Sequence, residues 1–229
     1  MKRLFIIPAK GRSTRIHQKN IRNFCGQPII KRVLSTILKV TKPNDTIHVS
    51  TDDDLVIQLC AEMSLKPEFS RPDSLCKDDT TLLEVRSYVL EKYNELGYNF
   101  GTIIQVLPTS VLLIPDVLTK AIKLVECDRK VDVLLSICPF STPIQWAYAL
   151  NNDYSLTPRE ETCLQTPSQN LKTFYHETGD FVIYKSASIA RREVNHRING
   201  YLLPYTSVDI DTMDDWYMAE KLFNGGLHG

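Results

Sequence analysis

Apolar segments of strand length alternate with segments of helical periodicity along the first part of the chain, up to Cys138. Strands that are separated by helices at this spacing form parallel pairs joined by crossover connections. We therefore predict an α/β fold with a Rossmann-like, doubly wound and mostly parallel sheet. The strand-like segments are 3–8, 46–50, 102–107 and 131–138, and the helical segments are 28–40, 53–64, 78–96 and 115–126.

The pattern changes after Pro139. Residues 139–200 are rich in Pro, Thr, Ser, Asn and Gln, and they show no helical period until about Lys185. We predict that this segment is an inserted lobe of irregular structure and short strands. The 229 residues are of a length typical of one domain, so the lobe belongs to a single domain spanning 1–229. Order returns with a predicted strand at 205–211 and a helix at 212–222.

The overall charge gives no indication of a nucleic acid or a membrane as a partner. Lys plus Arg and Asp plus Glu both number 27, so the formal net charge is zero. No apolar run approaches the ~20 residues that a membrane span needs. The first residues do not predict a signal peptide, because Lys10 and Arg12 interrupt the apolar run and no cleavage site follows.

The cysteines show no pattern of a metal site or a disulfide framework. None forms C-x-x-C, and none has a histidine nearby at ligand spacing. We predict free, reduced thiols in a cytoplasmic protein. The six cysteines are Cys25, Cys60, Cys76, Cys127, Cys138 and Cys163.

A polar, cationic loop at 9–20 follows the first predicted strand. A buried strand that leads into a small basic loop can direct backbone N–H groups and positive charge at a phosphate chain. The alternative is a solvated surface loop. The segment fits neither the P-loop pattern nor G-x-G-x-x-G, since Gly11 is its only glycine. The cations are Lys10, Arg12, Arg15 and Lys19.

Two carboxylates stand one residue apart near the C-terminus. Strand alternation would place Asp209 and Asp211 on one face, about 7 Å apart. Their repulsion would be about 2 kcal/mol at an effective dielectric constant near 20, and cations or a divalent ion can offset it. Mg²⁺ favours carboxylates together with phosphate oxygens and water. The alternative is a solvated pair of acids, with Asp211 capping the next helix.

The cationic loop resembles the phosphate loop of the CMP-sialic acid synthetase family, the cytidylyltransferases that activate nine-carbon keto sugars. That family reads I-P-A-R-x-x-S-K-x-I-P-x-K-N. Here Lys10 replaces the Arg, Thr14 the Lys and His17 the Pro. Arg12 and Arg15 lie beside the lost Lys and are candidates to compensate for it. The matching residues are Ile7, Pro8, Ala9, Ser13, Ile16, Lys19 and Asn20.

Three further segments are similar to motifs of this family. They are S-T-D at 50–52, R-P-x-x-L-x-x-D at 71–78 and D-I-D-T-x-x-D at 209–215. The resemblance implies a nucleotide-diphospho-sugar transferase-like fold, with Mg²⁺ held by Asp209 and Asp211. It also implies contacts of Arg71 with the cytosine or ribose, whereas an Arg beside acids more often forms a surface ion pair. The implied nucleotide-binding residues are Ala9, Gly11, Ser13, Asn20, Asp52, Arg71 and Thr80.

The sugar-binding segments are more similar to the branch of the family that activates pseudaminic acid. P-T-S at 108–110, P-I-Q at 143–145, S-Q-N-L at 168–171 and Y-H-x-x-G-x-F at 175–181 occur in the order of that branch. Asp180 departs from it, since the branch has Gln there. The implied substrate-binding residues are Thr109, Ser110, Gln145, Gln169, Tyr175 and His176.

The resemblance implies that CTP and a nonulosonic acid give a CMP-sugar and pyrophosphate, through attack of the anomeric hydroxyl on the α-phosphorus. It also implies a homodimer, in which the lobe at 139–200 is the dimerisation element and contributes to the partner's sugar site. No residue is assigned as general base. The alternatives are the same reaction on legionaminic, neuraminic or deoxyoctulosonic acid, and a catalytically weakened nucleotide-binding homodimer. The catalytic cations would be Lys10, Arg12, Arg15 and Lys19.

Overall fold

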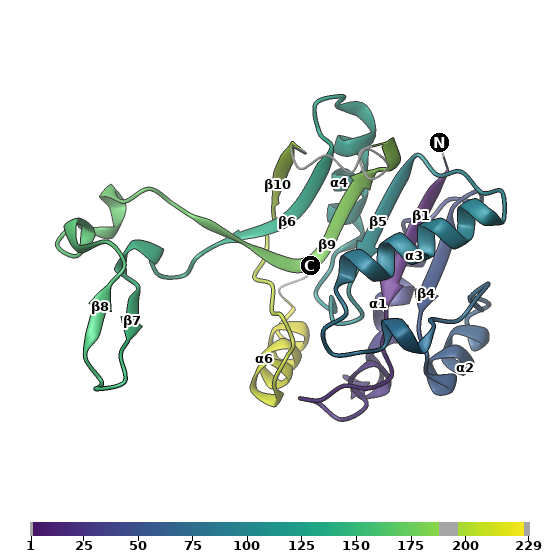
Figure 1. Cartoon of the computed structure of the whole chain (residues 1–229), viewed down its shortest axis with the longest axis horizontal. Coiled ribbons are helices and arrows are strands. Elements are labelled where there is room, and N and C mark those ends of the chain that lie inside the picture. The colour runs from purple at the N-terminus through teal and green to yellow at the C-terminus, as the bar shows by residue number, and fades with distance from the viewer. Residues whose placement is uncertain (1, 188–196, 227–229) are drawn as a thin grey trace.

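In a computed structural model of the chain, which describes residues 2–187 and 197–226, a six-stranded sheet has the strand order β10-β6-β9-β5-β1-β4 (Figure 1). β1 pairs in parallel with β4 and β5, and β10 pairs in parallel with β6. β9 runs antiparallel between β5 and β6. The mostly parallel, doubly wound α/β sheet predicted from the sequence is therefore confirmed. The strands are β1 Arg3–Pro8, β4 Thr46–Ser50, β5 Thr102–Val106, β6 Val133–Pro139, β9 Tyr175–Lys185 and β10 Ile198–Leu202.

Side-chain caps mark the start of α2, α3 and α6. The Asp53 carboxylate accepts a hydrogen bond from Leu55 N–H at the start of α2. Thr81 and Glu84 form a capping box on α3, and Thr212 and Asp215 form one on α6. The helices are α1 Ile29–Leu38, α2 Asp54–Glu62, α3 Leu82–Glu95, α4 Pro115–Cys127 and α6 Met213–Asn224. Short 3-10 turns lie at Lys19–Ile21, Asp73–Leu75, Ile144–Trp146, Glu161–Cys163 and Ser168–Asn170.

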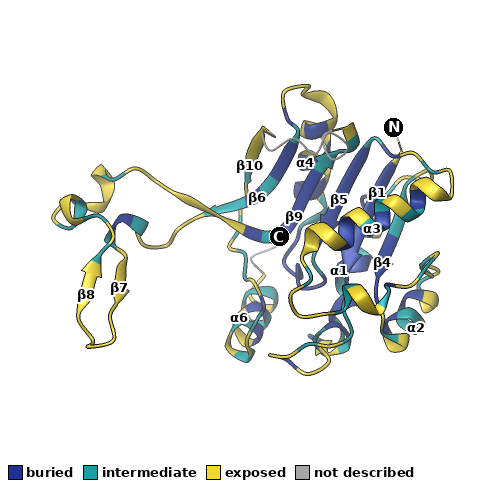
Figure 2. Cartoon of the chain, viewed as in Figure 1, coloured by how far each residue is buried: buried dark blue, intermediate teal, exposed yellow. Residues whose placement is uncertain are grey.

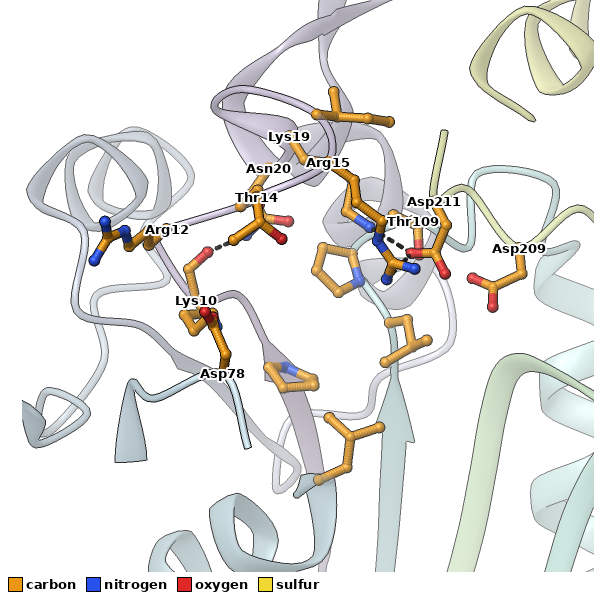
Figure 3. Close-up of a pocket in the computed structure, with 16 residues that line it drawn as sticks. Lys10, Arg12, Thr14, Arg15, Lys19, Asn20, Asp78, Thr109, Asp209 and Asp211 are labelled. Carbon is orange, nitrogen blue, oxygen red and sulfur yellow. Dashed lines mark hydrogen bonds and ion pairs between the residues drawn. The ribbon is translucent and has the colours of Figure 1, made fainter. Parts of the chain in front are cut away.

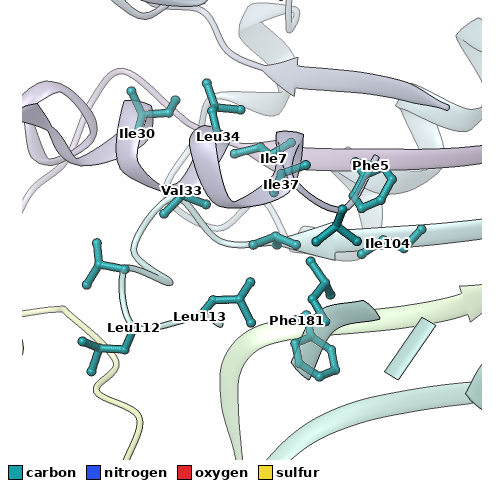
Figure 4. Close-up of a cluster of buried hydrophobic side chains, with 14 of the residues drawn as sticks. Phe5, Ile7, Ile30, Val33, Leu34, Ile37, Ile104, Leu112, Leu113 and Phe181 are labelled. Carbon is teal, nitrogen blue, oxygen red and sulfur yellow. The ribbon is translucent and has the colours of Figure 1, made fainter. Parts of the chain in front are cut away.

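The core lies on both faces of β1, every residue of which is buried (Figure 2). Phe5 and Ile7 belong to the larger hydrophobic cluster, which includes residues of α1 and α4. Figure 4 shows these two side chains beside those of α1. Leu4 and Ile6 belong to the smaller cluster with residues of α3. Fully burying one such side chain contributes about 1.5–3 kcal/mol, so a strand buried on both faces fixes the centre of the sheet.

The predicted strand at 205–211 is wrong. This segment makes no ladder pairing in the described sheet, and the last strand, β10, lies earlier in the chain. Gly200 allows β10 to lie close against β6, because a Cβ at this position would clash with Ile137. Pro204 lies two residues after the end of β10 and cannot donate a ladder hydrogen bond. The segment 205–211 therefore connects β10 to α6 without strand pairing.

The predicted lobe at 139–200 differs from what the structure contains. An arm at 140–174 projects from the body (Figure 1), whereas β9 and β10 belong to the main sheet. Polar residues near the middle of β9 interrupt its apolar pattern and hide the strand in the sequence. The helical periodicity that begins near Lys185 extends into 188–196, which lie outside the described residues. The arm carries the hairpin β7 Tyr148–Leu150 and β8 Leu156–Pro158, and a second small hairpin is β2 Asn23–Phe24 and β3 Gln27–Pro28.

Two further expectations concern the cysteines and the membrane. All six cysteines are described, and none of them has a disulfide partner in the described part of the chain. Among the helices at 2–187 and 197–226, none combines the length and the apolar character needed to cross a membrane.

Candidate active site

A cleft of about 510 Å³ opens at the carboxyl ends of the central strands (Figure 3). Its walls come from the loop after β1, the turn after β5, the start of α3 and the segment 209–211. Ligands of open α/β sheets bind outside the carboxyl ends of the strands. The cationic loop and the Asp pair singled out in the sequence therefore meet where such a fold binds its ligand.

Backbone contacts hold the loop after β1 in place. Gly11 N–H donates to Asp52 Oδ1 over 2.8 Å, and Asn20 Nδ2 donates to the Lys10 carbonyl over 2.8 Å. Ala9 N–H donates to the Ser50 carbonyl at the end of β4. A Cβ on Gly11 would lie 2.8 Å from the Asp53 Cβ, so only glycine permits this close approach. The side chains of Asp52 and Asn20 therefore stabilise the backbone conformation of the loop.

The loop cations are largely paired with acids of the same cleft. Lys10 Nζ lies 2.7 Å from Asp78 Oδ1, and Arg15 Nη2 lies 2.8 Å from Asp211 Oδ1. Lys19 Nζ lies 3.4 Å from Asp211 Oδ1 and donates to the Ile210 carbonyl. In Figure 3 the Arg12 side chain points away from the Asp pair, whereas Arg15 reaches across to it. Three of the four loop cations therefore contact an acid of the cleft in this structure.

The charges around the Asp pair give its two members different environments. Partial burial and the charge of Asp211 raise the pKa of Asp209, and Lys19 and Arg15 counteract part of this effect. Asp211 is the member that contacts cations directly. Asp215 belongs to the helix cap, where hydrogen bonds from Thr212 lower its pKa. Of the Asp pair, Asp211 therefore forms ion pairs, and Asp209 forms none within the part of the chain that the structure describes.

The donor set of this pair fits a magnesium ion better than a transition metal. Across residues 2–187 and 197–226 no group of three or more His, Cys, Asp or Glu residues could hold a metal ion. Two carboxylates at the edge of an open cleft leave the remaining coordination positions to phosphate oxygens and water, which is the usual arrangement for Mg²⁺. Asp209 and Asp211 are the residues that could hold such an ion.

Arg71 is a structural anchor in this structure. Its side chain is buried, and Nε and Nη2 donate to Ser50 Oγ and the Ser50 carbonyl over 3.1 and 2.9 Å. Burial lowers the pKa of Arg71, and its side chain makes no ion pair with Asp73 or Asp78. Thr80 lies in the turn before α3. Contacts of Arg71 and Thr80 with a base therefore remain predictions.

The two polar residues of the turn after β5 have different surroundings, one in the cleft and one against the sheet. Thr109 lines the cleft, whereas Ser110 Oγ donates to the Asp180 carbonyl over 2.9 Å. Sequence reasoning assigned both residues to the sugar. It gave no role in the cleft to Asp78, although the family motif ends on this residue, and the structure places Asp78 against Lys10.

Four predicted sugar-binding residues lie on or next to the arm, outside the cleft of the same chain. Gln145 Nε2 donates to the Lys172 carbonyl, and His176 packs against Phe140 with ring centroids 5.0 Å apart. The two others are exposed, Gln169 in a short turn and Tyr175 at the start of β9. The described chain therefore does not bring these four residues to the loop cations.

Comparison with known proteins identifies the family. A cytidylyltransferase family model matches residues 4–213. A pseudaminic acid cytidylyltransferase of Campylobacter jejuni strain 81-176 is 30% identical, with 97% of each chain covered. The CMP-N,N'-diacetyllegionaminic acid synthase of Legionella pneumophila is 24% identical, with 97% of this chain and 96% of the relative covered.

Solved structures show the same fold. The structure of a CMP:2-keto-3-deoxy-manno-octonic acid synthetase complexed with CTP matches with a TM-score of 0.72 and 15% identity, over 98% of this chain and 99% of that one. A 4-diphosphocytidyl-2C-methyl-D-erythritol synthase of Anaerococcus prevotii matches with a TM-score of 0.62 and 13% identity, over 97% and 98%. The family match covers nearly all of the described sheet, and the chain therefore belongs to the cytidylyltransferase family of nucleotidyltransferases.

Proposed function

We propose that this enzyme transfers CMP from CTP to a nonulosonic acid of the pseudaminic acid type and releases pyrophosphate. The observation that carries the proposal is the cleft in which Arg15 and Lys19 meet Asp211 across the carboxyl end of the sheet. Such a cleft can hold a polyphosphate and a divalent ion together. The relatives named for pseudaminic acid and legionaminic acid support the choice of acceptor class.

The loop after β1 would bind the triphosphate. Lys10, Arg15 and Lys19 are already directed toward the cleft, where they contact carboxylates that phosphate oxygens can replace. Displacement at the α-phosphorus moves negative charge to the leaving pyrophosphate, and preorganised cations stabilise that charge. Thr14 cannot supply a charge where relatives of the CMP-sialic acid synthetase type have Lys. Arg15 is adjacent to Thr14 and contacts Asp211 in the same cleft, so it is the candidate to supply that charge.

The metal requirement follows from the acids of the cleft. Asp209 and Asp211 would hold Mg²⁺. Burial and the charge of Asp211 raise the pKa of Asp209, and a divalent cation would relieve the repulsion between the two carboxylates. When bound, Mg²⁺ supplies positive charge that stabilises the developing charge on phosphate oxygens. Arg15 and Lys19 would then be released from Asp211 to contact phosphate instead. The chain's own residues thus exchange partners when the substrates bind.

The arm would complete the enzyme as a homodimer. It exposes apolar side chains along 140–174, which include Phe140, Tyr148, Leu150 and Tyr154. Exposed apolar patches of this kind mark interaction surfaces in soluble proteins. A second copy of the chain is the proposed occupant. In such a dimer, the predicted sugar-binding residues on and beside the arm would face the cleft of the partner subunit.

The unpaired thiols support a cytoplasmic location, because free cysteines persist in reducing compartments. Partial burial raises the pKa of Cys25 and Cys138, which is typical of unreactive packing residues. No role in the reaction is proposed for any cysteine.

The test is pyrophosphate release by the full chain with Mg²⁺, comparing CTP with UTP, ATP and GTP. The acceptors are pseudaminic, legionaminic, neuraminic and deoxyoctulosonic acids. We expect turnover with CTP and the highest kcat/KM with pseudaminic acid. Equal turnover with UTP would contradict the nucleotide assignment. CTP binding without turnover on any of these acids would instead support the catalytically weakened nucleotide-binding homodimer, which the loss of the loop Lys at Thr14 favours.

A further inference from the structure

An irregularity interrupts the pairing of β9 with β6. The first register ends at Leu135, which pairs with Val182, and a different register begins at Ile137. Between these points one residue of β6, Ser136, stands opposite four residues of β9, 178–181, which we call the β9 bulge. A bulge bends its strand, and bulges are common next to active sites, where they redirect side chains.

The hydroxyl of Ser136 holds the bulge where regular ladder bonds are missing. It donates to the Phe181 carbonyl over 3.0 Å and accepts from Phe181 N–H over 3.1 Å. It also accepts a hydrogen bond from Thr178 Oγ1 over 2.8 Å. Ser136 is fully buried, and its one donor and two acceptor positions are all used by residues of the bulge. Removal of this hydroxyl would therefore take partners from buried polar groups, which is unfavourable.

The bulge also packs against the turn at 107–110, which follows β5. Ser110 Oγ donates to the Asp180 carbonyl over 2.9 Å. Gly179 has a left-handed φ of 77°, and a Cβ at this position would lie 3.2 Å from Leu107 Cδ1. Leu107 lines the cleft. The bulge is therefore in contact with a part of the chain that forms the cleft wall.

The arm begins on the other side of the bulge. β6 and β9 pair again beyond it, and the last of these three residue pairs joins Pro139 to Tyr175. The chain between them, 140–174, is the arm that projects from the body (Figure 1). The bulge therefore lies between the base of the arm and the wall of the cleft.

We propose that the β9 bulge couples the arm to the cleft, with Ser136 and Ser110 as positioning residues. Ser136 fixes the bulge on β6, and Ser110 attaches the turn at 107–110 to the bulge. A displacement of the bulge therefore moves Leu107 and Thr109, which line the cleft. Ser110 then serves the site indirectly, and not through the contact with the sugar that the family resemblance implies.

The consequence for turnover rests on the proposed function, and it differs between the two substrates. The loop proposed to bind the triphosphate is held by Asp52, Asn20 and the Ser50 carbonyl. None of these bonds involves the bulge. Loss of a positioning serine should therefore raise the KM for the acceptor and leave the KM for CTP almost unchanged. The consequence for the order of the backbone does not depend on any substrate.

The variants that test the coupling are Ser136→Ala and Ser110→Ala in the full chain. Ser110→Thr is the conservative variant, because it keeps a hydroxyl at the same position. Thr102→Val is the matched control, since it removes a buried hydroxyl from β5 at the opposite end of its ladder with β9, where Thr102 pairs with Lys185.

Two readouts are compared. The first is hydrogen–deuterium exchange of the backbone amides at 107–110 and 175–181 in protein without substrates or metal. The second is steady-state pyrophosphate release with Mg²⁺, in which the KM for pseudaminic acid and the KM for CTP are measured separately. Local stability of each segment determines the first readout, and the shape of the cleft determines the second.

We expect Ser136→Ala to speed exchange at 107–110 as well as at 175–181, although within the described chain Ser136 hydrogen-bonds β9 and not this turn. The KM for pseudaminic acid should rise about tenfold, since small misplacements of substrate-positioning groups have effects of this order or larger. The KM for CTP should stay within about twofold. Ser110→Ala should act in the same way, and Ser110→Thr and Thr102→Val should resemble the unchanged protein.

Two results would overturn the inference. One is faster exchange in Ser136→Ala that is confined to 175–181, which would show that Ser136 stabilises β9 alone. The other is an equal effect of Thr102→Val at 107–110, which would show a general loosening of the sheet. If Ser136→Ala fails to fold, Ser110→Ala decides, because coupling requires faster exchange at 175–177 as well. Absence of turnover with CTP and every acid would refute the proposed function, whereas the exchange result would still decide the coupling.

Discussion

Replacement of Arg15 by Ala should lower kcat strongly while leaving the fold almost unchanged. Arg15 is the loop cation that reaches across the cleft to Asp211 with a distance of 2.8 Å (Figure 3). Its position beside Thr14 makes it the candidate for the charge that this loop has lost. The alternative candidate, Arg12, points away from the Asp pair in the same view.

The expected magnitudes for stability and catalysis differ. The side chains of Arg15 and Asp211 are 65% and 33% exposed, and an ion pair of such exposure contributes about 0.2–1 kcal/mol to stability. A preorganised group that stabilises charge in the transition state is worth more, and its removal typically lowers kcat by about 10²- to 10³-fold. Arg15→Ala should therefore change activity far more than it changes the free energy of unfolding.

The assay is steady-state pyrophosphate release, with the free energy of unfolding from urea titration measured in parallel. Arg12→Ala is the matched control, since it removes the same charge from the same loop, and its kcat should fall less than about threefold. Thr14→Lys alone should gain little. In the Arg15→Ala background, Thr14→Lys should recover part of kcat, because it returns a cation to the neighbouring position.

Two outcomes would refute this reasoning. If Arg15→Ala kept kcat within about threefold, Arg15 would be only a surface partner of Asp211. If Arg12→Ala fell as far as Arg15→Ala, the orientation of the loop in this structure would not describe its catalytic state. An increase of kcat in Thr14→Lys on its own would show that no cation of the loop replaces the missing Lys.

Three further predictions concern the metal, the arm and a buried histidine. Asp209→Asn combined with Asp211→Asn should lower Mg²⁺-dependent turnover at least about hundredfold without changing the unfolding midpoint; undiminished turnover would show a merely solvated pair. Light scattering at micromolar concentration should give a dimer, and Leu150→Asp with Tyr154→Asp should give a monomer; a monomeric unchanged protein would remove the dimer. Burial lowers the pKa of His48 from 6.5 to about 3, so below pH 6.5 the unfolded state binds a proton that the folded state does not. The free energy of unfolding should therefore drop by about 2 kcal/mol between pH 7 and pH 5 in the unchanged protein, relative to His48→Phe. The same pH dependence of the free energy of unfolding in both proteins, measured by urea titration, would contradict this.

The sequence alone determined the elements whose residues carry a local signal. The continuous apolar run of β1, the cap at Thr81 and the left-handed turn at Gly97 are each set within a few residues, so the strand and helices of the first half were predictable. The cationic loop and the Asp pair were also visible as local patterns. Their identity as parts of one site came from the resemblance to a family.

Alternation of apolar and polar residues indicates which side chains are buried, but it does not show whether the segment pairs with a neighbouring strand. Val208 and Ile210 flank Asp209 with the spacing of a strand, and this predicted a strand at 205–211. In the structure Ile210 is buried in the core, yet the segment pairs with no neighbour. β9 was not predicted for a related reason. Thr178 and Asp180 interrupt its apolar pattern, whereas its pairing with β5 and β6 is not visible in the sequence.

Only the tertiary structure decided which distant residues meet. Arg15 and Asp211 are separated by 196 positions, and their contact depends on the folding of the whole sheet between them. The same holds for Lys10 with Asp78, which are separated by 68 positions. Periodicity in a sequence indicates which side chains are buried. The partner of a buried or charged group depends on the order of the strands in the sheet, and no local sequence pattern contains that order.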